Sequence, residues 1–399
     1  MRNVVLIVTD DQEAGSLGVM RKLVARPGGD WVRFTGAYAN TSLCCPARAT
    51  LLTGQFAHRH GVTGNRDGAD LDDSDTLPVW LNDAGYRTGL FGKYLNGWPF
   101  VGRTSPPPGW DVFKTGGASA DVQFERAIAF MEASDEPFFA YVAPPEPHRP
   151  ATPRIRPEYA AAPVPIDKLR SNSVEADVSD KPAWVRGLPR RDDSAADAEL
   201  AERIAAQRAL LGVDDGVQRI VDSLTASGRL DDTLIVFVSD NGYSFGSHRH
   251  VGKNCVYEES AAVPLMIRYP NAAQRIVHRL VSHVNIAPTI VEWAGVVPTD
   301  VVDGRSLVPL LDGSGLGPSS EWSNEVLLEK RETGWPDTSS QFYAIRVIGW
   351  VYAEYDNGDR ELYDLEADRL QRENLAGRPE HAWRQAALRA QLNALRGLP

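Results

Sequence analysis

The sequence predicts an α/β fold: a large mixed, mostly parallel sheet sandwiched by helices, with a smaller C-terminal subdomain of antiparallel sheet plus helix. Over most of the chain, short runs of apolar and often β-branched residues alternate with longer helix-like segments, as is typical of strands covered on both faces. From about Ser319 the runs become short and alternating, which favours an antiparallel sheet. We therefore expect a large domain over residues 1–318 and an α+β subdomain packed on it over residues 319–399.

Apolar runs and punctuating residues predict the individual elements. The expected strands of the large sheet are Val4–Val8, Phe34–Asn40, Tyr86–Phe91, Pro137–Val142, Thr233–Ser239 and Val263–Tyr269. The expected helices are 46–53, 76–84, 120–133, 194–227 and 284–294, with stops at Gly54, Gly85 and Gly295. We expect the fourth of these helices to be bent or broken near Gly212. In the subdomain we expect strands at 326–328, 342–348 and 350–355, a hairpin turn at Asn357-Gly358 and a helix at 380–395.

Two segments are expected to lack regular structure. Residues 97–117 are rich in Gly and Pro and form a predicted loop. Residues 149–193 are rich in Pro, Arg and Asp, and a loop of that length over a sheet is often a functional lid. We expect this second loop and the C-terminal subdomain to shape a substrate pocket.

Composition excludes several classes of protein. The net charge of −11 over 399 residues argues against nucleic-acid binding, although a few local cations can still hold an anionic substrate. Three cysteines, two of them adjacent, cannot form a disulfide framework, which indicates a reducing compartment. No stretch is long enough to span a membrane. Val4–Val8 is too short for the core of a signal peptide, so we expect a cytoplasmic protein unless an export signal was trimmed.

The segment Ser42–Gly54 combines a cysteine, a proline and an arginine at the start of a predicted helix. Pro46 suits the first helical turn, so Cys44 is expected on the loop at the helix N-terminus, where partial positive charge gathers. Arg48, one turn later, can point back to the same place. This predicts a reactive side chain in an anion-binding corner. The same residues also fit a buried pair of small hydrophobic cysteines and a solvated surface arginine.

Acidic and amide side chains follow two of the predicted strands. Asp10 and Asp11 come directly after the first strand, and Asp240 and Asn241 come directly after the strand ending at Ser239. In α/β sheets, ligands bind at the carboxyl ends of the strands. Adjacent carboxylates repel each other unless a cation lies between them, and such oxygen ligands suit Ca²⁺ or Mg²⁺ rather than Zn²⁺. Alternatively, these acids are solvated loop residues or a helix cap.

Basic side chains reach the same predicted edge. Lys93 follows a strand, His148 lies on a proline-rich loop after another, and Lys253 follows His248 and His250. Each could be an ordinary surface charge. Together with Arg48, however, they provide the cations and donors that an anionic group under transfer requires. The combined set predicts a metal-assisted ester hydrolase.

These motifs resemble a known family. Cys44-Cys45-Pro46-Ala47-Arg48 followed by Leu51–Gly54 resembles the signature of the type I, formylglycine-dependent sulfatases of the alkaline phosphatase superfamily. Further matches occur in family order from residue 4 to about residue 375, at Val8–Gln12, Gly92–Tyr94, Pro145–His148, Ser239–Tyr243, Gly252–Glu259, Val284–Thr289 and Glu361–Leu365. The resemblance implies an alkaline-phosphatase-like fold and sulfate monoester hydrolysis by the domain over residues 1–318.

The resemblance also implies roles for individual residues. A separate formylglycine-generating enzyme would oxidise Cys44 to formylglycine (3-oxoalanine), whose hydrate attacks sulfur. The implied ligands of Ca²⁺, with Mg²⁺ or Mn²⁺ as alternatives, are Asp10, Asp11, residue 44, Asp240 and Asn241. Arg48 and Lys93 would orient the nucleophile, with Lys93 also binding the sulfate. His148 and Lys253 would hold the sulfate and protonate the leaving oxygen.

The chain departs from the family pattern at two positions. Ala47 stands where many relatives have Ser, and Leu95 stands where many have a His near the nucleophile. We expect His248 or His250 to take over that role and to contact the substrate. The strings Cys-Cys-Pro and Gly-Lys-Tyr-Leu-Asn resemble sulfatases that act on sulfated amino sugars of glycosaminoglycans.

Three functional hypotheses follow. The first is a Ca²⁺-dependent sulfatase for a small sulfated sugar, aryl sulfate or alkyl sulfate. The second is a phosphonate monoester or phosphodiester hydrolase, which shares the fold, the metal and the formylglycine. The third is a catalytically silent binding protein in which Cys44 is never converted.

Overall fold

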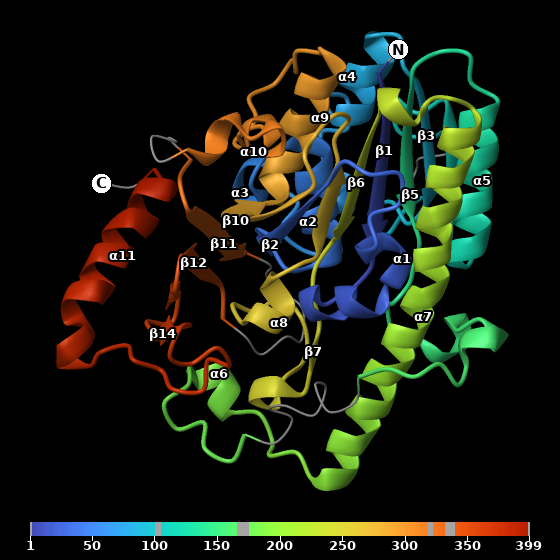
Figure 1. Cartoon of the computed structure of the whole chain (residues 1–399). Helices are drawn as coiled ribbons and strands as arrows, with labels where there is room; N and C mark the ends of the chain where they lie inside the picture. The colour runs from blue at the N-terminus through green and yellow to red at the C-terminus, as the bar shows by residue number, and fades with distance from the viewer. Residues whose placement is uncertain (1, 100–104, 166–174, 318–321, 332–339, 398–399) are drawn as a thin grey trace.

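An eight-stranded sheet lies at the centre of the computed structural model, which describes residues 2–99, 105–165, 175–317, 322–331 and 340–397 (Figure 1). The strand order is β10-β2-β9-β6-β1-β5-β3-β4. Among these strands only β9 is antiparallel to its neighbours, β2 and β6, so the predicted mixed, mostly parallel sheet is confirmed. The strands are β1 (Asn3–Thr9), β2 (Trp31–Tyr38), β3 (Arg87–Gly92), β4 (Val112–Thr115), β5 (Phe138–Ala143), β6 (Thr233–Ser239), β9 (Leu265–Arg268) and β10 (Arg275–Ser282).

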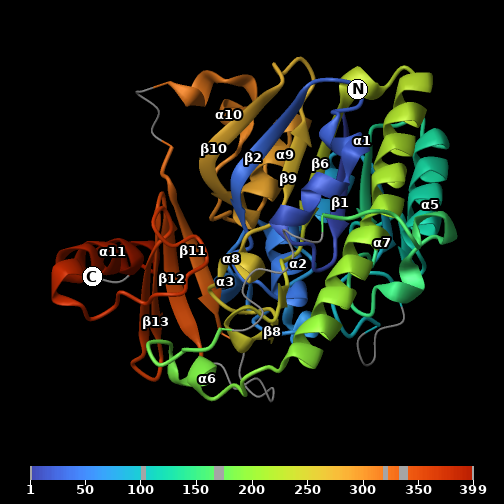
Figure 2. The ribbon, with the colours of Figure 1, turned by 60° about the horizontal axis from the view of Figure 1, so that its bottom comes forward.

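The central strand β1 sends alternate side chains into two cores, because successive side chains of a strand point to opposite faces. Val4, Leu6 and Val8 share one core with α2 (Cys44–Thr53), α4 (Leu77–Asp83) and α9 (Ile286–Ala294). Val5 and Ile7 share the other with α5 (Ala120–Glu132) and α7 (Asp193–Ala226), which lie side by side (Figure 2). Helices therefore cover both faces, as the continuous apolar runs predicted.

Helix α7 is a single α-helix of 34 residues, so the expected break near Gly212 is wrong. Of its two glycines, Gly216 is a packing position. A Cβ on Gly216 would lie 2.2 Å from Cδ2 of Phe124 on α5, whereas a Cβ on Gly212 would lie 3.1 Å from Cδ of Arg156, which is part of a flexible side chain. Close approach of α5 and α7, rather than a bend, explains the glycine at position 216.

We expect Gly216→Ala to lower the free energy of unfolding by about 1–3 kcal/mol, because an added methyl overpacks the contact with Phe124. Gly212→Ala in the same helix is the matched control. It should be neutral or stabilising by about 0.5–1 kcal/mol, since alanine is the better helix former. Urea unfolding of both variants checks this. Equal stabilities of the two variants would show that the α5–α7 contact is not close packed.

Two strands of the large sheet were missed by sequence patterns. Strand β10 (Arg275–Ser282) is an edge strand beside β2, and the charged or polar residues Arg275, His278 and Arg279 interrupt its apolar residues. The four-residue strand β4 lies at the opposite edge and corrects the expectation that residues 97–117 are wholly loop. The remaining short elements are α1 (Arg21–Val24), α3 (Ala57–His60), α6 (Ala183–Arg186), α8 (Glu258–Ala261), α10 (Val308–Asp312), β7 (Ser244–Phe245) and β8 (Val251–Gly252).

The C-terminal sheet is antiparallel and four-stranded, in the order β11-β12-β13-β14. One face packs against α11 (Ala382–Leu395), and the other packs against residues of the large domain. The backbone N–H of Glu329 donates to the carbonyl of Asn40 at 2.8 Å, which ties β11 to the segment between β2 and α2. The division of the chain after residue 318 stays a prediction. The strands are β11 (Glu325–Lys330), β12 (Phe342–Val347), β13 (Trp350–Tyr355) and β14 (Arg360–Asp364).

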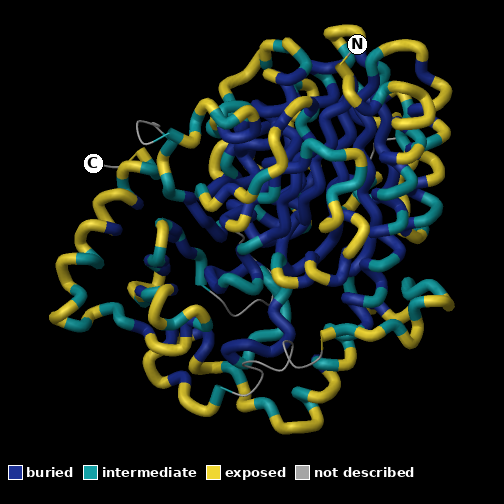
Figure 3. The backbone as a smooth tube through the Cα atoms, viewed as in Figure 1, coloured by how far each residue is buried: buried dark blue, intermediate teal, exposed yellow. Residues whose placement is uncertain are grey.

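Buried residues concentrate in the large sheet and the helical faces turned toward it, while exposed positions line the outer turns of α7 and α11 (Figure 3). Every residue of β1, β5 and β6 is buried. Within the described ranges, no helix combines the length and apolar character that crossing a bilayer requires. The carboxyl ends of the buried parallel strands β6, β1, β5 and β3 lie side by side at one edge of the sheet.

Candidate active site

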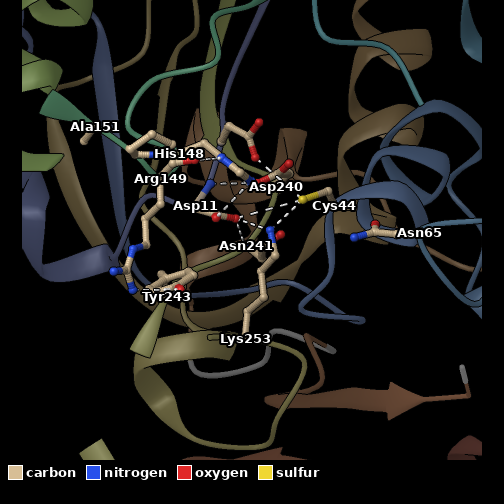
Figure 4. A network of polar contacts seen from close by, with 12 residues as sticks. Asp11, Cys44, Asn65, His148, Arg149, Ala151, Asp240, Asn241, Tyr243 and Lys253 are labelled. Atoms are coloured by element: carbon tan, nitrogen blue, oxygen red, sulfur yellow. Dashed lines mark hydrogen bonds and ion pairs between the residues drawn. The ribbon is translucent and has the colours of Figure 1, made fainter. Parts of the chain in front are cut away.

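The four neighbouring strand ends carry most of the predicted site residues. Helix α2 adds Cys44 and Arg48, and the turn after β8 adds Lys253. In Figure 4 the side chains of Asp11, Cys44, Asn241 and Lys253 converge on one point. The residues that follow the strands are Asp10 and Asp11 after β1, Lys93 after β3, His148 after β5, and Asp240 and Asn241 after β6.

Cys44 is the first residue of α2, rather than part of the preceding loop as expected. Its buried thiol donates to Oδ1 of Asp10 at 3.6 Å and accepts a hydrogen bond from Nζ of Lys253 at 2.6 Å. Burial raises the pKa of the Cys44 thiol to about 11, although Lys253 and Lys93 oppose that rise. The thiol is therefore protonated at neutral pH, and a protonated thiol is a poor nucleophile.

Arg48 is fully buried, so the surface interpretation of this residue is wrong. Its Nε donates to Oδ2 of Asp240 at 2.8 Å, and its Nη1 donates to the carbonyl of Lys93 at 2.9 Å. Burial alone would lower the pKa of Arg48, but Asp240 and other negative groups raise it above its ordinary value. Arg48 thus joins the ends of β3 and β6 beneath the site and stays charged.

Lys93 and Asp10 form an ion pair at the end of the sheet. Nζ of Lys93 lies 2.9 Å and 2.7 Å from the two carboxylate oxygens of Asp10. Burial raises the pKa of Asp10, but Lys93 and Arg48 outweigh it and hold that pKa well below its usual range. Gly92 permits this approach, because at its φ of +118° a Cβ would lie 1.9 Å from the carbonyl oxygen of Ala143.

Asp11 has a left-handed backbone, with φ of 65°. Such a conformation costs a non-glycine residue about 1–3 kcal/mol and is concentrated at functional sites. Oδ1 of Asp11 accepts a hydrogen bond from Nδ2 of Asn241 at 2.7 Å and pairs with Lys253. The Asp11 backbone N–H donates to Oδ1 of Asp240 at 3.1 Å. The strained turn therefore aims the Asp11 carboxylate toward the centre of the site.

His148 lies at the open side of the site, and its side chain is 40% exposed. Its Nε2 lies 3.7 Å from Oδ2 of Asp11, and its Nδ1 contacts the carbonyl of Arg149 at 2.6 Å. A cavity of about 400 Å³ opens beside His148, Asp10 and Lys93. A substrate bound in that cavity would meet His148 and Lys93 from one side.

Four of these residues can hold a metal ion. One ligand atom each of Asp10, Asp11, Cys44 and His148 lies within 4.8 Å of the others. In addition, Oδ1 of Asn241 is buried and has no hydrogen-bond partner among the described residues. Two carboxylates with an unpaired amide oxygen beside them match the oxygen ligands that Ca²⁺ and Mg²⁺ prefer. The residues present therefore fit a hard divalent cation.

His248 and His250 are held by partners outside this cluster. Nδ1 of His248 contacts Oε2 of Glu175 at 2.7 Å, and its buried ring stacks on Tyr257 at 3.9 Å. Nε2 of His250 contacts the backbone carbonyl of Lys253 at 3.2 Å. These contacts support the chain around Lys253. The expected role of either imidazole in binding substrate stays a prediction.

Some supporting residues carried no sequence signal. Oδ1 of Asn65 accepts the backbone N–H of Cys45 at 3.0 Å and so satisfies a donor in the first turn of α2. The carboxylate of Glu146 accepts the backbone N–H of Ala120 at 3.0 Å, and burial raises the pKa of Glu146 to about 7. Both partners are distant in sequence, so no local motif could reveal them.

The buried imidazole of His60 contacts α2 through Thr50. Its Nδ1 accepts the backbone N–H of Val62 at 3.1 Å, so the proton lies on Nε2, which contacts Oγ1 of Thr50 at 3.1 Å. Burial lowers the pKa of His60 from 6.5 to about 3. The native state therefore binds this proton more weakly than the unfolded chain does, and stability is lost as pH falls below 6.5.

We expect His60→Gln to reduce the loss of unfolding free energy between pH 7 and pH 5 by about 1–2 kcal/mol, because the group that resists protonation is gone. Urea unfolding at both pH values, in the presence of a chelator, measures this difference. The exposed His278→Gln variant controls for the loss of one histidine. Identical pH dependence of wild type and His60→Gln would contradict the expectation.

Comparison with known proteins gives consistent matches over the whole chain. The family model described as Sulfatase matches residues 2–296, and the model described as N-sulphoglucosamine sulphohydrolase, C-terminal, matches residues 246–397. The arylsulfatase of Volvox carteri is 28% identical over 98% of this chain and 73% of its own length. The N-acetylglucosamine-6-sulfatase of Homo sapiens is 30% identical over 83% of this chain and 68% of its own length.

Other relatives are longer or share only the fold. The chain is 31% identical to the extracellular sulfatase SULF-1 homolog of Drosophila melanogaster but covers only 33% of that protein. A structure solved with its substrate D-glucosamine-2-N,6-O-disulfate superposes with a TM-score of 0.77 at 25% identity, covering 99% of this chain and 97% of the other. A phosphonate monoester hydrolase of Agrobacterium radiobacter superposes with a TM-score of 0.82 at 23% identity, covering 100% and 96%, which shows the shared fold alone.

Proposed function

Because the chain belongs to the sulfatase family of sulfuric ester hydrolases, we propose that it hydrolyses a sulfate monoester with a nucleophile made from Cys44 and a bound divalent cation. The observation that carries the proposal is the place of Cys44. Its side chain lies at the head of α2 within hydrogen-bonding distance of Asp10 and Lys253, beside the cavity that contains Lys93 and His148.

The state of the Cys44 thiol supports conversion before catalysis. A thiol with a pKa near 11 is not a nucleophile at neutral pH, so the residue needs a different functional group to attack sulfur. The proposed group is formylglycine, which a separate formylglycine-generating enzyme makes from Cys44. When hydrated, this aldehyde supplies a hydroxyl nucleophile in the same position.

The proposed metal is Ca²⁺, with Mg²⁺ or Mn²⁺ as alternatives. Asp10, Asp11 and residue 44 would hold it, with Asp240 and Asn241 completing the set. A bound divalent cation polarises sulfate oxygens and lowers the energy of developing charge. Lys253 and Lys93 neutralise these carboxylates, and their side chains are 12% and 21% exposed, whereas that of Arg48 is 1% exposed.

The remaining roles follow from position and charge. Lys93 and Arg48 hold positive charge beneath the nucleophile, and Arg48 also fixes Asp240. His148 faces the cavity with an exposed imidazole, so it is placed to donate a proton to the leaving oxygen. Lys253 contacts the side chain at position 44 and stabilises negative charge on the transferred group.

The proposed substrates are sulfated sugars. The human relative is named for N-acetylglucosamine 6-sulfate, and one structural neighbour was solved with a disulfated glucosamine. A cavity of about 400 Å³ lies in the size range of pockets that bind small ligands. Lys93 and Arg154 both line it, so its charge favours anionic sugars.

Matched esters test the reaction. We expect kcat/KM for 4-nitrophenyl sulfate to exceed that for the corresponding phenylphosphonate ester by at least about 10-fold, which is a difference of about 1.4 kcal/mol in transition-state binding. Both esters release the same chromophore, so the leaving group is constant. A reversed ratio would favour the phosphonate or phosphodiester hydrolase, and an unmodified thiol at Cys44 throughout protein from the native host would favour a silent binding protein.

A further inference from the structure

The cavity beside the site is lined by the residues proposed to bind the sulfate and also by residues that have no proposed role in catalysis. Asp10, Lys93 and His148 form one part of its lining, and Trp98, Thr115 and Arg154 form another. Asp10 is the only carboxylate among the described lining residues, and Lys93 already neutralises it. Arg154 therefore adds a positive charge to a part of the cavity that the catalytic roles do not use.

Arg154 is held in place by backbone atoms rather than by an acid. It ends the short 3-10 helix Thr152–Arg154, and its Nη1 donates to the carbonyls of His148 at 2.9 Å and Pro150 at 2.8 Å. No carboxylate lies within ion-pairing distance of Arg154 in the described part of the chain. Burial raises the pKa of Glu146, and the charge of Arg154 opposes that rise without a hydrogen bond or ion pair between the two side chains. The guanidinium is thus fixed without being neutralised.

The two bonds from Nη1 use both of its hydrogens and leave the Nε–Nη2 edge of the guanidinium without a partner among the described residues. That edge carries parallel N–H groups that match the oxygens of a carboxylate or sulfate, which it can bind in a bidentate manner. Because the side chain is half-buried and already anchored, an anion bound there would order few additional torsions.

Trp98 supplies a flat wall to the same cavity. Its ring is held edge-on by Tyr94 and Phe113, at centroid distances of 5.7 Å and 5.3 Å. The negative face of an indole attracts the C–H groups on the apolar face of a pyranose ring. An aromatic wall and a fixed cation beside a sulfate-binding centre are complementary to a sugar with charge at two positions.

We propose that Arg154 binds a second anionic group of the substrate. The preferred substrate is then a sulfated sugar with another sulfate or a carboxylate near the scissile ester. This inference rests on the proposed sulfatase function, and it names the substrate feature that the site selects. Arg154 is a specificity-determining residue, because it contacts a part of the substrate that does not react.

Competition against 4-nitrophenyl sulfate tests the proposal on the full, converted, metal-loaded chain. The probes are three forms of glucosamine 6-sulfate that differ only at nitrogen: N-acetyl has no second anion, N-sulfo adds a sulfate, and N-succinyl adds a carboxylate. We expect N-sulfo or N-succinyl sugar to have an inhibition constant about 10- to 100-fold below that of the N-acetyl sugar, as for loss of a charged bidentate contact. Whichever anion discriminates identifies the second group.

In Arg154→Gln the ratio of these inhibition constants should fall to about 2-fold or less, because the charged contact to the second anion is lost. Any displacement of His148 by the same change weakens binding of all three sugars alike and leaves the ratio of their inhibition constants intact. Lys114→Gln is the control, because Lys114 is exposed on β4 beside the lining residue Thr115 and its loss changes net charge equally. The inference is overturned if wild type does not discriminate, if Arg154→Gln keeps the preference, or if none of the sugars inhibits. Absence of 4-nitrophenyl sulfate hydrolysis by wild type refutes the proposed function instead.

Discussion

Replacing Cys44 with alanine is expected to abolish sulfate ester hydrolysis, with kcat lower by about 10⁴-fold or more, as for removal of a covalent nucleophile. No aldehyde can form at alanine, so the attacking group is absent. The fold should persist, because Cys44→Ala removes one buried sulfur atom, its weak contacts with Asp10 and Asp11, and the hydrogen bond that it accepts from Lys253. Steady-state kinetics on 4-nitrophenyl sulfate, with metal content matched to wild type, measures the loss.

Cys45→Ala is the matched control for this experiment. Cys45 is buried next to Cys44 on the same helix, but its thiol lies outside the cluster of potential ligands formed by the described residues. We expect it to keep activity within about 3-fold, since its removal costs only packing. Full activity of Cys44→Ala, or equal loss in both variants, would show that position 44 is not the source of the nucleophile.

The second large effect concerns the metal. Asp10→Asn keeps the shape of the side chain but removes a negative charge from the cluster of Asp10, Asp11, Cys44 and His148. We expect affinity for Ca²⁺ to fall by about 100-fold or more, because loss of even an outer-shell partner costs about 10- to 100-fold. Lys93 also loses its ion-pair partner and adds an uncompensated positive charge beside the site.

Calorimetric titration of chelator-treated protein with CaCl₂ measures this affinity without relying on catalysis. Asp356→Asn, in an exposed turn of the C-terminal sheet, controls for the loss of one negative charge. Its affinity for Ca²⁺ should equal that of wild type. Unchanged affinity in Asp10→Asn would place the metal elsewhere, and a site without measurable Ca²⁺ affinity in wild type would point to Mg²⁺ or Mn²⁺.

The sequence predicted the architecture of the sheet because its strands are buried on both faces. Runs such as 4–8 and 234–238 are continuously apolar, and each is followed by a polar residue at the edge of the sheet. Strand β10 escaped this rule because it lies at the edge of the sheet and its first half is partly exposed, so charged residues interrupt its apolar run. Helix α7 was predicted with a break near Gly212 because glycine is a poor helix former, but the helix continues through both Gly212 and Gly216.

The candidate site was predictable where chemistry follows strand ends, and less so where it depends on tertiary contacts. Asp10, Lys93 and Asp240 come together because parallel neighbouring strands end at one edge. The contact of His248 with Glu175 joins residues 73 positions apart, and a histidine in sequence does not reveal which acid it will meet. Arg154 likewise lies in a long loop without periodicity, so only the folded chain shows that it lines the cavity.

The central claim is that Cys44 becomes the nucleophile by conversion to formylglycine, and the mass of the peptide containing residue 44 tests it most directly. Preparations of the protein made with and without a formylglycine-generating enzyme should be digested, and their peptide masses compared with their specific activities toward 4-nitrophenyl sulfate. We predict that an aldehyde replaces the thiol at position 44 and that specific activity rises in proportion to the converted fraction. A fully active preparation that carries an unmodified thiol at Cys44 throughout would contradict the account.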